Sequence, residues 1–370
     1  MVTFGSVCSG IESASVAWLP LGFRSTWFAE VDPFPCAVLA HHYPDTPNLG
    51  DMTGVAALVL SGAVDAPDIL IGGTPCQAFS VAGMREGLAD ERGGLTLKFV
   101  EVANAIDYVR GRAGKPAAVI VWENVPGVLQ DTANAFGCYL AALVGESEAL
   151  QPSGGKWSDA GCVYGPARAV AWRVLDSQYF GLAQRRRRVF VVASSRNGFD
   201  PASILFESEG VRRDIAPSRG TGPELARGFT CGVDFRNHSL TGDLAHTLQA
   251  GKKGPAPGNM PHVLTTPGIM SVHGTQDPDL LFDMVHPLGR NAGQENAIFE
   301  AGQVRRLTPL EYERLQGFPD YYTLISWRGK PATDTPRYSA IGNSKPIPVV
   351  RWIGRRLFEA LSIDEVTYGS

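Results

Sequence analysis

The chain has 370 residues, enough for two domains or one large elaborated domain. Hydrophobic residues make up 44% and charged residues 19%, which excludes a globally disordered chain. No apolar run approaches the roughly 18 residues needed to span a membrane, and the N-terminus lacks the basic flank and apolar core of a secretory signal, so we expect a cytoplasmic protein. The net charge of −4 argues only weakly against a polyanion ligand, because the arginines are clustered, with four in a row at 185–188.

The first 196 residues alternate short apolar runs with helical patterns. We expect strands at Val2–Val7, Ser25–Ala29, Ile69–Ile71, Ala118–Trp122 and Arg188–Ala193. The helical patterns between them include Ser13–Leu19, Pro35–His41 and Leu97–Val109. This alternation predicts an α/β fold with a mostly parallel sheet covered on both faces. Ligands bind such sheets beyond the carboxyl ends of the strands.

The composition and periodicity of the sequence change twice after residue 196. Between 197 and 303 glycine and proline become more frequent and the strand–helix alternation fades, which indicates a second, smaller, loop-rich domain. From 304 to 370 helical periodicity returns in LTPLEYERLQGF and VVRWIGRRLFEAL. We therefore expect three segments, 1–196, 197–303 and 304–370, with the last rejoining the first domain.

One of the six cysteines stands out. No two of the six form a CxxC pair or a zinc-like cluster with histidines, so we expect no metal site. Cys76 lies in GGTPCQAFS, directly after an expected strand, in a glycine- and proline-rich turn from which a nucleophile could project into a cleft. A thiol needs a positive neighbour or a base to react at neutral pH. Its other reading is a buried small hydrophobic residue.

Two further motifs are expected at strand ends on the same edge. Glu123 lies in WENVPGV, where a partly desolvated carboxyl group could hold or deliver a proton, or merely cap a helix. In AQRRRRVFVV, strand alternation would put Gln184, Arg186 and Arg188 on one face, able to bind a phosphate, a carboxylate or a developing oxyanion. The alternative is a solvated basic edge.

The N-terminal strand ends in VCSGIES, a turn with the single glycine Gly10. Glu30 follows about 20 residues later, a spacing typical of nucleotide-binding folds in which a carboxylate holds ribose hydroxyls. Asp51, in LGDM, is a further polar candidate at this edge.

Five ordered strings together resemble the cytosine-5 DNA methyltransferase family of phages and bacteria. They are PCQAFSVAG with GLADERGGL, ENVPGV, QRRRRVFVV, RRLTPLEYERLQGFPD and YSAIGNSKPIPV. The resemblance implies a Rossmann-like fold that depends on S-adenosyl-methionine, with 197–303 as a target-recognition domain that reads double-stranded DNA in the major groove. It also implies a bacterial cell or a phage-infected host.

The resemblance assigns catalytic roles to four residues. Cys76 would attack carbon 6 of a flipped cytosine, making carbon 5 nucleophilic toward the sulfonium methyl group. Glu123 would contact ring nitrogen 3 and the exocyclic amine, and Arg188 would bind the carbonyl oxygen. Arg186 would help to fix the nucleophile loop and a nearby phosphate, and Gln184 looks structural.

The resemblance also assigns cofactor contacts. Glu30 would hold the ribose hydroxyls and Asp51 the adenine amine, and the turn at Ser9, Gly10 and Ile11 would pass the methionine moiety. The other contacts that we expect are Cys8, Val31, Met52, Pro75, Asn343, Ser344 and Lys345.

Several residues depart from the family pattern. Cys8 replaces an aromatic residue, only Gly10 remains of three glycines, and Arg187 stands where an acid is common. Lys345 stands where the family usually has a small or apolar residue. We expect its side chain to extend to solvent or to pair with an acid. The alternative is that it offsets a negative charge on the transferred group, as in carboxy-S-adenosyl-methionine, so that a carboxymethyl group is transferred.

Other functions fit less well. A dehydrogenase would leave the cysteine, glutamate and arginine motifs without a role, and a thiol hydrolase would need a histidine beside Cys76, whereas the only histidines of the first 196 residues are His41 and His42. A DNA-binding protein that has lost catalysis is a fairer rival, but every catalytic position of the family is intact in this chain. An RNA substrate stays open, although the long recognition segment favours DNA. We expect a monomer, and a restriction endonuclease partner stays open. The candidate base-reading residues are Arg236, Asn237, Lys252, Lys253 and Arg290.

Overall fold

The structure is a computed structural model that describes residues 1–75, 94–207 and 303–367, together with six short strands between 231 and 300. It divides into two compact units. The first unit contains Met1–Asp176, Arg187–Arg212 and Ser344–Ser370, and the second contains Ser177–Arg186 and Arg213–Asn343. The expected boundaries at 196/197 and 303/304 do not coincide with this division.

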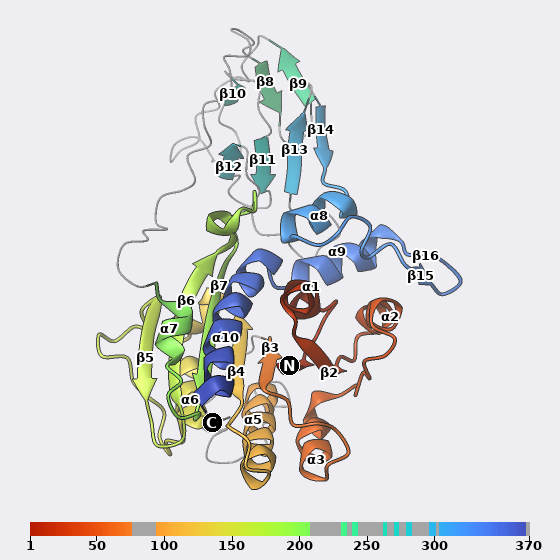
Figure 1. Ribbon diagram of the computed structural model, residues 1–370. Coiled ribbons are helices and arrows are strands. Elements are labelled where there is room, and N and C mark those ends of the chain that lie inside the picture. Colours follow the sequence, from red (N-terminus) through yellow and green to blue (C-terminus); the bar gives the residue numbers. More distant parts are fainter. Residues whose placement is uncertain are drawn as a thin grey trace. The chain divides into compact units, whose positions relative to one another are not determined.

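In its described residues the first unit is built on a seven-stranded sheet with the order β2-β1-β3-β4-β7-β6-β5 (Figure 1). The strands are β1 (Thr3–Val7), β2 (Arg24–Ala29), β3 (Ile69–Gly72), β4 (Val119–Asn124), β5 (Ala160–Tyr164), β6 (Ala169–Asp176) and β7 (Arg187–Ser194). The five strands expected from the sequence are confirmed to within two residues at each end. β5 and β6 were not expected.

The sheet is parallel only from β2 to β4. The pairs β4–β7, β7–β6 and β6–β5 are antiparallel, so the expectation of a mostly parallel sheet is wrong for half of the neighbouring pairs. For the pairs β6–β5 and β7–β6 the reason is the length of the connections. Short links join β5 to β6 and β6 to β7, and none is long enough for the helical crossover that a parallel pair requires.

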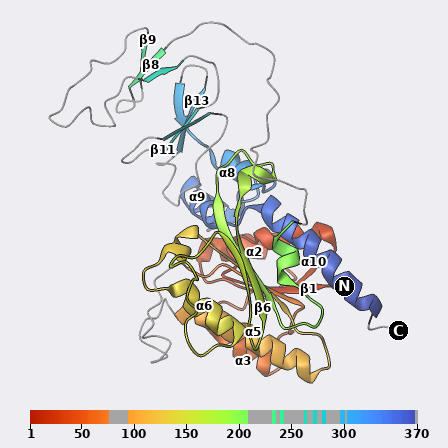
Figure 2. The ribbon, with the colours of Figure 1, turned by 90° about the vertical axis from the view of Figure 1, so that its left-hand side faces the viewer.

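Helices cover both faces of this sheet. α1 (Ser13–Trp18), α7 (Pro201–Leu205) and α10 (Ile347–Thr367) lie on one face, and α3 (Val55–Leu60), α5 (Gly94–Arg112) and α6 (Ala135–Val144) lie on the other (Figure 2). α2 (Pro33–His42) follows β2. Short 3-10 helices lie at Leu19–Leu21, Met52–Gly54 and Pro126–Gln130. The indole of Trp18 donates a hydrogen bond of 2.8 Å to the carbonyl of Val350, which joins α10 to the start of the chain.

The centre of the sheet explains why its strands read as apolar runs. Every residue of β3 and β4 is buried, as expected for strands covered on both faces. A Cβ added at Gly72 would lie 2.7 Å from both Phe99 of α5 and Val7 of β1. Only glycine therefore allows α5 to pack this closely at the end of β3.

In the residues that the structure describes, the second unit contains short sheets and two α-helices. Its strands are β8 (Cys231–Asp234), β9 (Ser239–Gly242), β10 (His262–Leu264), β11 (Met270–His273), β12 (Asp279–Phe282), β13 (Asn296–Glu300), β14 (Gln303–Arg306), β15 (Ser326–Trp327) and β16 (Lys330–Pro331). They pair in the orders β10-β8-β9, β12-β11-β13-β14 and β15-β16. A 3-10 helix lies at Ser177–Phe180.

The two helices of the second unit are α8 (Pro309–Gln316) and α9 (Asp334–Asn343). α8 starts at a capping box in which Thr308 and Glu311 bind each other's backbone amides. α8 and α9 pack on each other within this unit, so the segment expected at 304–370 is divided, and only its part from Ser344 onward belongs to the first unit. In the described part of the chain, no helix combines the length and the apolar character needed to cross a membrane.

Candidate active site

Most of the residues singled out from the sequence lie at one edge of the first unit's sheet. β1, β2, β3 and β4 are parallel, so their carboxyl ends meet there. β7 runs in the opposite direction and therefore begins at the same edge, where Asn124 pairs with Val189. The turns after β1, β2 and β3 thus lie close to the end of β4 and the start of β7.

Glu123 and Arg188 form an ion pair at this edge. Nε of Arg188 lies 3.2 Å from Oε1 of Glu123, and both side chains are largely buried. Burial lowers the pKa of Arg188, and the carboxylate of Glu123 opposes this effect. The pair therefore presents one acceptor and one donor group side by side in a partly desolvated place.

The segment that leads to Cys76 is held by a buried hydrogen-bond network. The hydroxyl of Thr74 accepts from the indole of Trp122 at 2.9 Å and lies 2.6 Å from the hydroxyl of Thr96. The amide of Asn124 donates to the carbonyl of Thr74 at 3.0 Å. Thr74 is 3% exposed, so its position is set by β4 and α5. Cys76 itself lies outside the described residues, and Pro75, the last residue before it, is exposed.

Glu30 connects the ends of β1 and β2. Its Oε2 accepts from the backbone amide of Gly10 at 2.7 Å, and its Oε1 accepts from those of Val31 and Asp32. Gly10 has a φ of 59°, and nothing lies within 4 Å of the point where a side chain would begin. The carboxylate is thus fixed beside an open space, with lone pairs left for further donors.

The first turn is braced by Ser9 and Cys8. The hydroxyl of Ser9 accepts from the amide of Ala29 at 3.2 Å, and the thiol of Cys8 lies 3.4 Å from the sulfur of Met52. Burial, followed by the charge of Glu30, raises the pKa of Cys8 to about 12. Cys8 therefore stays a neutral thiol and packs against Met52, and it does not act as a nucleophile. Ile11, next in this turn, is buried.

Asp51 and Val31 lie on the solvent side of the same edge. One oxygen of Asp51 caps the following turn through the amide of Thr53, and Val31 is 66% exposed, unusual for an aliphatic side chain. An apolar surface beside two carboxylates suits a nucleoside, with Glu30 for ribose hydroxyls and Asp51 for an exocyclic amine. The residues present therefore fit the S-adenosyl group that the resemblance implies.

The position of Lys345 corrects one expectation. The residue is 8% exposed, so its side chain does not extend to solvent. Its Nζ and Oε2 of Glu123 lie 3.3 and 3.1 Å from the point where a side chain at Gly73 would begin. Among the described residues it forms no ion pair within 4.0 Å. The expectation failed because the residue lies between α9 and α10, in a buried link.

Three expected residues lie elsewhere or have another environment. Arg186 belongs to the second unit, is 1% exposed, and donates to the carbonyl of Gly342 at 2.9 Å. Gln184 is fully buried in the same unit. β7 begins only at Arg187, so strand alternation does not govern these two residues as expected. Asn343, also in the second unit, is exposed, whereas Ser344 in the first is buried.

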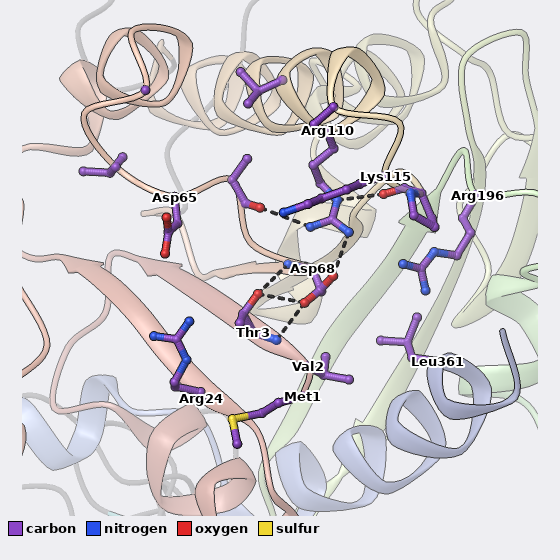
Figure 3. A pocket seen from close by; sticks show the side chains of 16 residues that line it. Met1, Val2, Thr3, Arg24, Asp65, Asp68, Arg110, Lys115, Arg196 and Leu361 are labelled. Carbon is purple, nitrogen blue, oxygen red and sulfur yellow. Dashed lines mark hydrogen bonds and ion pairs between the residues drawn. The ribbon is translucent and has the colours of Figure 1, made fainter. Parts of the chain in front are cut away.

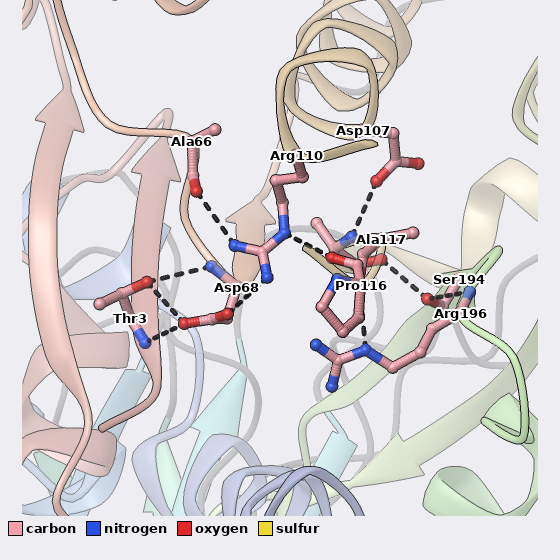
Figure 4. Close-up of polar contacts among 10 residues, drawn as sticks. Thr3, Ala66, Asp68, Asp107, Arg110, Pro116, Ala117, Ser194 and Arg196 are labelled. Carbon is pink, nitrogen blue, oxygen red and sulfur yellow. Dashed lines mark hydrogen bonds and ion pairs between the residues drawn. The ribbon is translucent and has the colours of Figure 1, made fainter. Parts of the chain in front are cut away.

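A pocket of about 730 Å³ lies at the opposite, amino edge of the sheet (Figure 3). It contains none of the residues singled out above. Asp68 accepts from the amide and hydroxyl of Thr3 and pairs with Arg110 at 2.6 Å (Figure 4). These groups satisfy one another and join β1, β3 and α5, so we assign this network a structural role.

Three parts of the site were not expected from the sequence. Asn48 accepts from the amide of Glu30 at 2.9 Å and donates back to its carbonyl, which holds the loop that carries Asp51. Glu12, with a φ of 61°, caps α1 from a buried position. No pattern marked either residue. Asn124 belongs to the ENV string, but only its contact with Thr74 reveals its role.

The chain resembles known DNA methylases over most of its length. The model of the C-5 cytosine-specific DNA methylase family matches residues 2–205 and 267–359. A relative from Escherichia phage P1, named DNA N-6-adenine-methyltransferase, is 43% identical over 97% of this chain. The chain covers 61% of that relative's length. The Type II methyltransferase M.HpaII of Haemophilus parainfluenzae is 26% identical over 97% of this chain and 90% of its own length.

Solved structures show the same fold. A DNA modification methyltransferase encoded within an Escherichia coli prophage has a TM-score of 0.57 at 17% identity, with 98% of this chain and 100% of that chain covered. The Dnmt2 methyltransferase of S. pombe has a TM-score of 0.54 at 14% identity, with both chains fully covered. With the family model matched over most of its length, the chain belongs to the C-5 cytosine-specific DNA methylase family.

Proposed function

We propose that this chain is a DNA (cytosine-5)-methyltransferase in which Cys76 is the nucleophile. The observation that carries the proposal is the ion pair of Glu123 and Arg188 at the strand edge, beside the backbone that leads to Cys76. One edge of cytosine presents an amine, a ring nitrogen and a carbonyl oxygen in a row. A carboxyl group next to a guanidinium group complements this edge.

The residues divide the chemistry among themselves. The thiolate of Cys76 adds to carbon 6 of the flipped cytosine and forms an S–C bond, which makes carbon 5 nucleophilic. Glu123 binds nitrogen 3 and the amine, and Arg188 stabilises the charge that develops on the carbonyl oxygen. S-adenosyl-methionine, the donor used by this family, supplies the electrophilic methyl group. Loss of the proton from carbon 5 and cleavage of the S–C bond then release the methylated base and regenerate Cys76.

The target base must leave the duplex before it can reach this edge, which costs a few kcal/mol of stacking and pairing. We propose that 197–303 reads the DNA around the target in the major groove. The candidate base-reading residues named from the sequence all lie outside the described residues.

The adenine named for the phage P1 relative suits the described site less well. Adenine offers an amine but no carbonyl oxygen for Arg188 to bind. Its exocyclic nitrogen accepts a methyl group without prior addition of a thiol, so Cys76 would have no task. The chain covers only 61% of that relative, and we propose the cytosine activity for the part that the two share.

The decisive experiment supplies the full chain with duplex DNA and S-adenosyl-methionine, followed by mass spectrometry of the nucleosides. We expect 5-methylcytosine in DNA, and N6-methyladenine alone would overturn the proposal. A duplex with 5-fluorocytosine should trap an adduct on Cys76, since fluorine blocks the final proton loss. Cys76→Ser should lose the adduct, and Cys162→Ser, which changes an exposed thiol, should keep it. A parallel reaction with tRNA tests the RNA alternative.

A further inference from the structure

Lys345 is a buried cation at the catalytic edge that the proposed function leaves without a role. It is 8% exposed and follows Ser344 in the link that leads into α10. Its Nζ and the carboxylate of Glu123 approach the same point above Gly73, within 3.3 Å. The ammonium group therefore faces the place where we propose that the base is held.

No described acid neutralises this charge by direct contact. Oε1 of Glu123 is paired with Arg188, and the buried carboxylate of Glu12 accepts from the amide and hydroxyl of Ser15. The charge of Lys345 still acts on buried groups near the site, namely Cys8 and Glu12. Burial raises the pKa of Cys8 and of Glu12, and the charge of Lys345 opposes the increase in both. The nearby acids thus have other partners, and among the described residues Lys345 acts on them only through its charge.

A charge in such a place is costly unless a partner compensates it. Removing an ammonium group from water costs several kcal/mol, and buried charges are normally paired. The sulfonium of S-adenosyl-methionine is itself positive, so its transferable end would be repelled by Lys345. A donor that carries a negative charge on the transferred carbon would instead supply the missing partner.

We propose that this chain accepts an S-adenosyl donor whose transferable group bears a carboxylate, with Lys345 as the counter-ion of that carboxylate. This rests on the proposed function, because the same attack by Cys76 activates carbon 5. The new bond joins carbon 5 to the carboxymethyl carbon as the bond from that carbon to sulfur breaks, which leaves neutral S-adenosyl-homocysteine. Loss of the carbon 5 proton and of the bond to Cys76 gives 5-carboxymethylcytosine. No oxidant or further reactant is required.

Binding without DNA tests the ion pair apart from catalysis. The affinities of S-adenosyl-methionine and of its carboxymethyl-sulfonium analogue are measured by calorimetry for the wild type, Lys345→Met and Lys345→Arg. We expect the wild type to prefer the carboxylated donor by about tenfold or more, as for a charge-assisted hydrogen bond in a buried site. Lys345→Met should lose that preference, and Lys345→Arg should retain part of it. Lys98→Met, which removes an exposed lysine of α5, should bind like the wild type.

A reaction with both donors at equal concentration then identifies the product. 5-Carboxymethylcytosine from the wild type and 5-methylcytosine from Lys345→Met support the inference. Equal affinities in the wild type, or methylcytosine alone from the wild type, overturn it while the cytosine activity stands. Failure of the proposed function looks different, because neither donor would then modify cytosine and 5-fluorocytosine would trap no adduct. Thermal unfolding curves check that each variant is folded. If Lys345→Met does not fold, the comparison of donor affinities uses Lys345→Arg.

Discussion

Replacing Asn124 by alanine should slow turnover far more than it weakens cofactor binding. Asn124 donates to the carbonyl of Thr74 at 3.0 Å and accepts from the amide of Val125 at 2.8 Å. Asn124 and Thr74 are 6% and 3% exposed, so water cannot replace the lost partner of Thr74. An unsatisfied buried group costs about 1–3 kcal/mol. If about 2 kcal/mol of this falls on the segment before Cys76, its productive conformation becomes about 30-fold rarer, since 1.4 kcal/mol is a factor of ten.

The assay compares kcat on duplex DNA with the affinity for S-adenosyl-homocysteine. We expect kcat to fall about 30-fold and the affinity to stay within about twofold, because Glu30 and Gly10 lie at the ends of other strands. Asn134→Gly is the matched control. It removes bonds to Leu150 and Trp157 at 2.8 and 2.9 Å, and a φ of 56° makes glycine the strain-free replacement. Unchanged kcat in Asn124→Ala, or an equal loss in both variants, would refute the positioning role.

Two further predictions test the edge of the sheet that holds Glu123, and a third tests the opposite, amino edge. Gly73→Ala places a Cβ 3.1 Å from the carboxylate of Glu123 and 3.3 Å from the ammonium of Lys345, so kcat should fall about tenfold. Gly127→Ala, with its nearest contact at 3.9 Å, should keep the wild-type rate, and equal rates in the two variants would show that these side chains move aside. Glu123→Gln should reduce turnover more than DNA affinity, and parallel losses in kinetic and binding assays would make Glu123 structural. Asp68→Asn should lower the free energy of unfolding at pH 7 by about 2 kcal/mol. Burial by itself would raise the pKa of Asp68, but the hydrogen bonds from Thr3 and the ion pair with Arg110 outweigh burial and lower the pKa below its ordinary value of 3.8. The stabilisation from Asp68 is therefore complete above pH 3.8 and is lost as the pH falls through the pKa of the folded state. Free energies of unfolding from urea titrations of the wild type and of Asp68→Asn should become equal in acid. A difference that stays constant with pH would contradict the structural role of the Asp68 carboxylate.

The sequence predicted the parallel half of the sheet well because β3 and β4 are buried throughout and β2 ends in the buried run Trp27–Ala29. It did not predict β5 and β6, because AGCVY and AVAWRVLD lie among glycines, prolines and charged residues that read as loop. α6 was missed for a different reason. Nine of its ten residues are buried, so it has no polar face to mark a helical period. Strand direction was wrong where short links replace helical crossovers.

Within the site, too, the sequence identified some residues and missed others. The residues that carry charge or reactivity stood out, because Glu30, Glu123 and Arg188 lie at strand ends in recognisable strings. The residues that hold them did not. Asn48 acts through its amide on the backbone of Glu30, a contact that depends on the loop's path and not on its composition. Lys345 was misjudged because a lysine beside a proline reads as exposed, and only the packing of its link buries it.

The bond from the indole of Trp18 to the carbonyl of Val350 joins residues 332 positions apart, and α10 packs on α1 around it. A ribosome that adds about 5–20 residues per second needs on the order of 20–60 s to make the intervening chain. During that time the apolar face of α1 has no cover, which makes the nascent chain a candidate for chaperone binding. The link that carries Lys345 also emerges late. Translation therefore delays assembly of the edge of the sheet at which Glu123 and Lys345 meet.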